Sequence, residues 1–111
     1  MNDKIKSENT DSLFKAILTL RTVEECYAFF DDLCTVPEIK AMSQRFAVAK
    51  MLEAGDIYTE IVERTGASTA TISRVNRSLG GGYDIVFDRL KEKQQYTPAE
   101  NANSGEEQTE G

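Results

Sequence analysis

The 111-residue chain is predicted to be an all-α protein of about six helices. Apolar residues recur at every third or fourth position, as on one face of a helix, and nowhere alternate strictly as in a half-buried strand. Glycine and proline divide the chain into helix-length pieces, with breaks at Gly55, at Gly66 and at residues 80–82. A chain of this length can bury one modest core, so we expect one domain.

Two helices are expected before residue 35. The first covers about Asp11–Leu20, and Asp11 or Ser12 is suited to cap its start. The second runs from about Thr22 to Leu33, because Thr22 followed by Glu25 matches a capping box. Its apolar positions repeat at helical spacing: Val23, Cys26, Tyr27, Phe30, Leu33 and Cys34.

The third and the last helix are the most clearly patterned outside residues 57–79. The third begins near Pro37, a residue suited to a first turn, and Gly55 is a natural stop. Its apolar stripe is Ile39, Met42, Phe46, Ala49 and Leu52. The last helix covers about residues 83–95, with an apolar stripe of Tyr83, Val86, Phe87 and Leu90.

The charge is unevenly distributed along the chain. The net charge is −6, from 13 basic and 19 acidic residues. Residues 97–111 carry four glutamates and no basic residue, so without them the chain has 13 basic and 15 acidic residues. Their polar composition predicts a disordered acidic tail. We expect a flexible N-terminus over residues 1–10 and a helical domain over residues 11–96.

The composition argues against several classes of protein. The chain has no histidine, so no Ser–His or Cys–His pair can form within it, and we expect no enzyme. Cys26 and Cys34 are expected to be reduced, small, buried apolar residues, with no metal site or cofactor. No apolar run approaches the roughly 20 residues that span a bilayer, and residues 1–8 lack a secretory signal. We therefore expect no membrane partner and a cytoplasmic location.

Residues 57–79 have the pattern of two short helices joined by a tight turn. Ile61 and Val62 would face the core from the first helix, and Gly66 would relieve the turn. The second helix would direct Ile72, Val75 and Leu79 inward at spacings of three and four. This arrangement predicts a helix-turn-helix.

The outer face of the second helix is unusual for a surface helix. Ser68 is a good N-cap, and small polar side chains follow it where better helix formers would be expected. Small residues let a helix enter a major groove, and arginines can bond phosphates or base edges. No acid occurs between Arg64 and Tyr83. The residues predicted to bind double-stranded DNA are Ser68, Thr69, Ala70, Thr71, Ser73, Arg74, Asn76 and Arg77.

These features favour a sequence-specific, DNA-binding transcriptional regulator. An alternative is a helical protein-interaction module without autonomous DNA reading, because the chain is acidic overall and its tail is rich in glutamate. A ligand-dependent repressor is a third interpretation. A helical hairpin that binds nothing would share the turn glycine and the apolar spacing, but not the acid-free outer face.

Three stretches resemble a known family: Thr35–Arg45, Ala49–Gly55 and Gly66–Arg74. They are similar to the Trp repressor family and, more closely, to its tryptophan-repressor-like (YerC/YecD) group. The resemblance covers about residues 33–79. It implies an intertwined helical homodimer acting as a repressor, whose two recognition helices reach successive major grooves about 34 Å apart.

Members that bind tryptophan hold it with two arginines, a threonine and a serine. The matching positions are Thr35, Arg45, Arg74 and Ser78. Val75 stands where the tryptophan-responsive repressor has glycine, and its isopropyl group would fill the indole space. Asp32 replaces an apolar residue in the loop beside the ligand. Each arginine also has another interpretation, since Arg45 could pair with Glu38 and Arg74 could bind a phosphate. A small-molecule effector of the tryptophan kind therefore stays an alternative.

Overall fold

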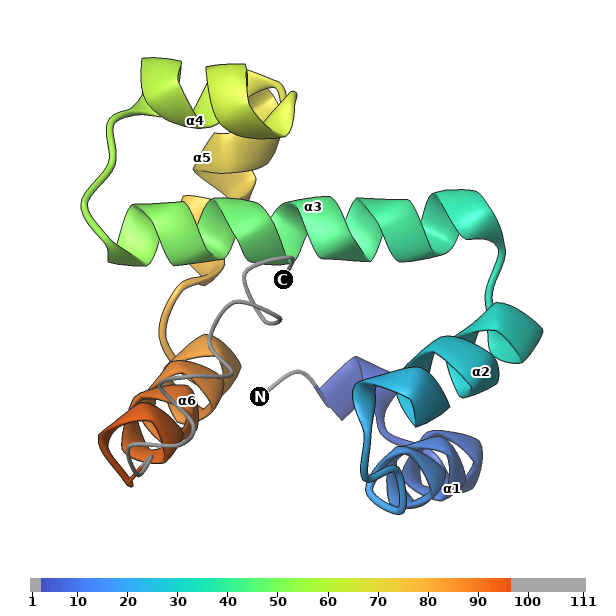
Figure 1. The fold of residues 1–111 in the computed structure, drawn as a ribbon. Helices are drawn as coiled ribbons and strands as arrows, with labels where there is room; N and C mark the ends of the chain where they lie inside the picture. Colours follow the sequence, from blue (N-terminus) through green and yellow to red (C-terminus); the bar gives the residue numbers. More distant parts are fainter. Residues whose placement is uncertain (1–2, 97–111) are drawn as a thin grey trace. The chain divides into compact units, whose positions relative to one another are not determined.

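The computed structural model describes residues 3–96, and all the regular structure in this range is helical (Figure 1). A short 3₁₀ helix, η1 (Asp3–Ile5), is followed by α1 (Glu8–Ile17), α2 (Val23–Leu33), α3 (Val36–Glu53), α4 (Tyr58–Thr65), α5 (Thr69–Ser78) and α6 (Gly82–Tyr96). The prediction of an all-α chain with about six helices is confirmed.

The chain divides into two compact units, residues 1–77 and 78–111. The predicted tail, 97–111, lies outside the described residues. None of the helices described is long and apolar enough to cross a membrane.

The first helix begins earlier than its sequence pattern predicts. Ser7, not Asp11 or Ser12, is the N-cap: its Oγ accepts a hydrogen bond from the Thr10 N–H at 3.0 Å. The helix ends at Ile17, and residues 18–20 close a tight turn through backbone hydrogen bonds. The start of α1 and all of η1 fall within residues 1–10, which were expected to be a flexible N-terminus.

The start of α2 matches its prediction in part. The Thr22 Oγ1 accepts a hydrogen bond from the Glu25 N–H at 3.0 Å, so Thr22 is the N-cap. The Glu25 carboxylate accepts from the Arg21 N–H at 2.8 Å, one residue before the partner that a capping box requires. The prediction that both cysteines are buried is wrong: Cys26 is exposed and Cys34 half-buried. The reason is that α2, like α1, contributes no buried residue to this chain.

Both ends of α3 are well defined. Thr35 and Glu38 form a complete capping box, and Pro37 lies in the first turn, as predicted. At the other end, the Gly55 N–H donates to the Leu52 carbonyl and the Asp56 N–H to the Met51 carbonyl, each at 3.0 Å. This pair of bonds is a Schellman motif, and it requires the left-handed φ of +90° that Gly55 adopts. The predicted stop at Gly55 is confirmed.

The core of the first unit lies between α3, α4 and α5, which Figure 1 shows beside one another. Its side chains are at most 2% exposed: Val48, Ala49, Ile61, Ala67, Ile72 and Val75. Val48 is outside the predicted stripe of α3, because apolar residues occur around much of this helix and leave no single clear face. Of that predicted stripe, Ala49 is buried and Met42 is exposed.

The second unit contains α6. The rings of Tyr83 and Phe87 stack with their centroids 5.9 Å apart, and Phe87 is buried. Val86 and Leu90 are exposed, so the predicted apolar stripe of this helix is only partly buried. Gly80 and Gly81 have φ values of +102° and +50°, conformations that favour glycine and explain the break before α6.

Candidate nucleic-acid interface

Residues 58–78 form the predicted helix-turn-helix, and Gly66 makes its turn. The Gly66 φ is +73°, and its N–H donates to the Val62 carbonyl at 2.9 Å, which closes the end of α4. A Cβ at this position would meet nothing within 4 Å. Glycine is therefore favoured here by backbone conformation and not by lack of space.

Thr65 connects the turn to both neighbouring helices. Its Oγ1 donates to the Ile61 carbonyl at 2.7 Å and accepts from the Ala67 N–H at 3.1 Å. Its carbonyl accepts a hydrogen bond from the Gln44 Nε2 at 3.1 Å. Gln44 lies on α3, 21 residues away, so local sequence patterns contain no signal for this contact. The Gln44 bond holds the turn against α3, and the two bonds of the Thr65 hydroxyl hold it at the end of α4.

Ser68 begins α5, as predicted. Its Oγ accepts from the Thr71 N–H and donates to the Thr71 Oγ1, each at 3.1 Å, while its carbonyl accepts from the Ile72 N–H. These bonds satisfy the start of the helix, so the Ser68 hydroxyl is already engaged within the chain.

The predicted DNA-binding residues surround the side of α5 that faces away from the core. Ile72 and Val75 are buried, and this fixes the orientation of the helix. Positions 70, 73, 74 and 77 follow the helical repeat of three and four and share the opposite face. Six of the eight predicted residues are exposed, whereas Thr71 and Ser73 are half-buried.

The electrostatics of this face are uniform. Arg64, Arg74 and Arg77 are all exposed, and the sequence has no acid from Arg64 to Tyr83. The positive end of the α5 dipole, near Thr69, adds to the same field. A local positive surface on an acidic chain can attract and orient a polyanion.

The predicted ligand-binding residues lie on two helices. Thr35 caps α3: its Oγ1 accepts from the Glu38 N–H at 3.3 Å, and the Glu38 carboxylate accepts from the Thr35 N–H at 2.8 Å. The hydrogen bond from the Thr35 backbone N–H holds the pKa of Glu38 below its usual 4.5, and a hydrogen bond with the Thr35 side chain lowers it to a smaller extent. Within residues 3–96 no ion pair or hydrogen bond joins Arg45 to Glu38.

The other predicted ligand positions differ in exposure. Arg45 on α3 is exposed, and so are Arg74 and Ser78 on α5. Val75 is only 2% exposed, because its side chain belongs to the core between α3 and α5. Asp32 is exposed near the end of α2.

A recognition helix with an acid-free outer face, set on a buried helix-turn-helix core, defines the class of helix-turn-helix DNA-binding regulators. The model of the family described as Trp repressor protein matches residues 8–94. The chain therefore belongs to the Trp repressor family.

Relatives agree along most of the chain. An uncharacterized protein of Bacillus subtilis, YerC, is 53% identical over 93 residues, which cover 81% of this chain and 89% of YerC. A crystal structure of a TrpR-like protein from Eubacterium eligens is 57% identical with a TM-score of 0.77, covering 81% of this chain and 96% of that one. A structure from Staphylococcus aureus, described as a candidate Trp repressor, is 53% identical with a TM-score of 0.77. The match covers 82% of this chain and 95% of that one.

Proposed function

We propose that this protein is a sequence-specific transcriptional regulator that binds double-stranded DNA as a homodimer in the cytoplasm. The outer face of α5 is the observation that carries the proposal. Opposite the buried Ile72 and Val75, this face presents small side chains and two exposed arginines without an acid. Such a helix can enter a major groove, where small polar groups contact base edges and arginines contact bases or phosphates.

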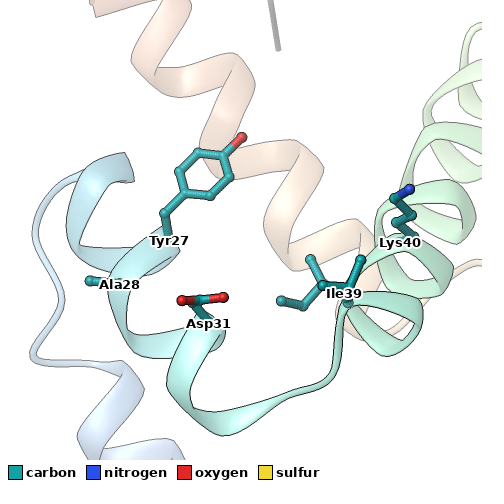
Figure 2. Close-up of a pocket in the computed structure, with 6 residues that line it drawn as sticks. Tyr27, Ala28, Asp31, Ile39 and Lys40 are labelled. Carbon is teal, nitrogen blue, oxygen red and sulfur yellow. The ribbon is translucent and has the colours of Figure 1, made fainter.

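The uncovered apolar surface of α1, α2 and the start of α3 supports the homodimer. Large exposed apolar residues in this region are Phe14, Leu18, Val23, Tyr27, Leu33, Val36 and Met42. An open hollow of about 430 Å³ lies between α2 and α3. Figure 2 shows Tyr27 and Asp31 of α2 lying across from Ile39 of α3. Large apolar side chains exposed on neighbouring helices are typical of an interaction site. A second copy of the chain would cover these side chains and would place two α5 helices symmetrically.

Selection from a random duplex pool near physiological salt, followed by sequencing of the bound fraction, tests this function. A homodimer should enrich a pseudo-palindrome whose half-sites lie about one helical turn, or 34 Å, apart. Only weak, salt-sensitive binding without enrichment would contradict sequence-specific regulation. If the purified protein shows no such enrichment but carries a stably bound partner protein, the protein-interaction module is favoured instead.

We further propose that DNA binding by this chain does not require tryptophan. The side chain of Val75 is part of the core, where the tryptophan-responsive repressor has a glycine, and the Thr35 Oγ1 already caps α3. The chain has no tryptophan of its own, so added tryptophan would supply the only indole emission. We expect neither a shift of that emission nor a change in affinity for the selected duplex at millimolar tryptophan. A saturable shift accompanied by tighter duplex binding would contradict this.

A further inference from the structure

A second hollow lies beside the helix-turn-helix, between α3 and the end of α4, with Ile39 and Ala47 as its apolar lining. It has a volume of about 460 Å³ and is open to solvent. Its polar lining consists of Lys40, Ser43 and Gln44 from α3 and Arg64 and Thr65 from α4. No acidic residue lines it. The site predicted from sequence did not include this hollow, because Lys40 and Arg64 are 24 positions apart and belong to different helices.

The hollow is held in shape by the contacts of the turn. Gln44, at its half-buried side, donates through Nε2 to the Thr65 carbonyl at 3.1 Å. Thr65 is in turn bonded to Ile61 and Ala67 through its hydroxyl. The backbone that carries Lys40 is therefore fixed relative to the backbone that carries Arg64.

The charge of the hollow is suited to an anion. Lys40 and Arg64 are both exposed, and within residues 3–96 neither forms an ion pair with an acid. Lys40 stands between the two hollows, because it also lines the first one together with Asp31. Two cations at one depression, with no nearby acid in the lining, concentrate positive potential there. The Ser43 hydroxyl adds a neutral hydrogen-bond donor to the same wall.

The place of the hollow in the chain indicates which anion would reach it. Arg64 and Thr65 directly precede the Gly66 turn, and α5 begins at Thr69. The hollow is thus continuous in the chain with the predicted DNA-binding residues. When α5 lies in a major groove, the backbone beside that groove is the nearest array of negative charge.

We propose that the Lys40–Arg64 hollow binds a phosphate of the DNA backbone flanking the groove that α5 enters. This inference rests on the proposed function and extends its interface from α5 to α3 and α4. Contacts to phosphates fix the register and orientation of a protein on the duplex but carry no sequence information directly. The hollow therefore strengthens binding to the selected site and to unrelated duplexes alike.

The test compares Lys40→Gln, Arg64→Gln and the double variant with the wild type. Lys15→Gln, an exposed lysine of α1, is the matched control with the same loss of charge. Affinity is measured against salt concentration for the selected duplex and for an unrelated one. Each single variant should flatten the slope of log K against log [salt] by about 0.9 per subunit, or about 1.8 for a homodimer, and the double variant should flatten it further. At physiological salt, affinity for both duplexes should fall by about two- to fivefold.

Several outcomes would overturn the inference. If the wild type binds the selected duplex but all three hollow variants keep its slope, the hollow does not contact phosphate, and the proposed function stands without it. A changed sequence preference in the variants would assign base reading instead. Titration of the protein with inorganic phosphate separates DNA phosphate from free anions. If the wild type binds phosphate saturably and the variants do not, while the salt dependence of duplex binding is the same in all of them, the hollow is a site for free anions. If the wild type binds no duplex at all, the proposed function fails and this inference fails with it.

Discussion

The two parts of the first unit differ in how they are stabilised. The region from α3 to α5 contains six side chains that are at most 2% exposed, whereas α1 and α2 contain no buried residue. Both regions have large apolar residues, so composition does not explain the difference. The helix-turn-helix forms its core within one chain, whereas α1 and α2 leave large apolar side chains exposed. Folding of the helix-turn-helix and assembly of the proposed homodimer should therefore be separable by mutation.

The largest expected effect is in the core of the helix-turn-helix. Ile72→Ala should lower the free energy of unfolding by about 2–5 kcal/mol, because it leaves a cavity beneath α5 where Ile72 is fully buried. Urea unfolding followed by circular dichroism measures this loss. Phe14→Ala is the comparison in α1, where the side chain is 49% exposed, and at low protein concentration it should cost far less. Equal losses would mean that the two regions share one core.

The second prediction concerns the surface of α1 and α2. Leu18 is 83% exposed and Tyr27 is 73% exposed, and a second copy would bury both. Tyr27→Asp should raise the dimer dissociation constant by about 30-fold or more, the effect of losing an interface residue worth about 2 kcal/mol. Sedimentation equilibrium measures it, with Lys15→Gln as a surface control. A variant that stays fully dimeric would remove Tyr27 from the interface.

The third prediction separates two kinds of contact on α5. Arg77→Ala should weaken binding to all duplexes by about two- to fivefold and flatten the salt dependence, because it removes a phosphate contact. Thr69→Ala should instead change which sequences are selected, since a lost base contact costs about 1–3 kcal/mol of discrimination. Repeating the duplex selection with each variant measures both effects. Identical selected sequences for wild type and Thr69→Ala would exclude Thr69 from base reading.

Sequence patterns predicted the helix-turn-helix better than the rest of the fold, and the reason is physical. Ile61, Ile72 and Val75 were predicted to face inward because α4 and α5 each bury one narrow face at helical spacing. On α3 the apolar residues are spread around the helix, so the burial of Val48 could not be read from periodicity. The burial expected for Cys26 was wrong because α2 buries none of its residues within the described part of the chain.

The candidate site shows the same division between local and distant information. The Ser68 cap and the Gly66 turn depend on neighbouring residues, and both were predicted. The Gln44–Thr65 hydrogen bond and the Lys40–Arg64 hollow each join residues of two helices, so only the folded chain brings them together. Contacts between distant residues leave no periodic signal in a single sequence.

The fourth prediction concerns the junction between the two regions, at the start of α3. Thr35→Ala removes the hydroxyl that accepts the Glu38 N–H and should cost about 1 kcal/mol of unfolding free energy. Thermal and urea unfolding measure the loss, with Thr35→Ser, which keeps a capping hydroxyl, as the control. If Thr35→Ala and Thr35→Ser unfold alike, the hydroxyl does not stabilise α3.

The last prediction uses pH to isolate the other half of that capping box. The Thr35 N–H holds the pKa of the folded Glu38 carboxyl below its usual 4.5, so the native state binds fewer protons than the unfolded chain. The contribution of Glu38 to stability is therefore complete above about pH 4.5 and is lost as pH falls through the lowered pKa. Relative to Glu38→Gln, the wild type should lose stability over that acidic range. Thr35→Ala keeps the backbone N–H, so it should retain most of this pH dependence. Parallel stability curves for the wild type and Glu38→Gln, measured by urea unfolding from neutral to acidic pH, would show that the carboxylate bond does not stabilise α3.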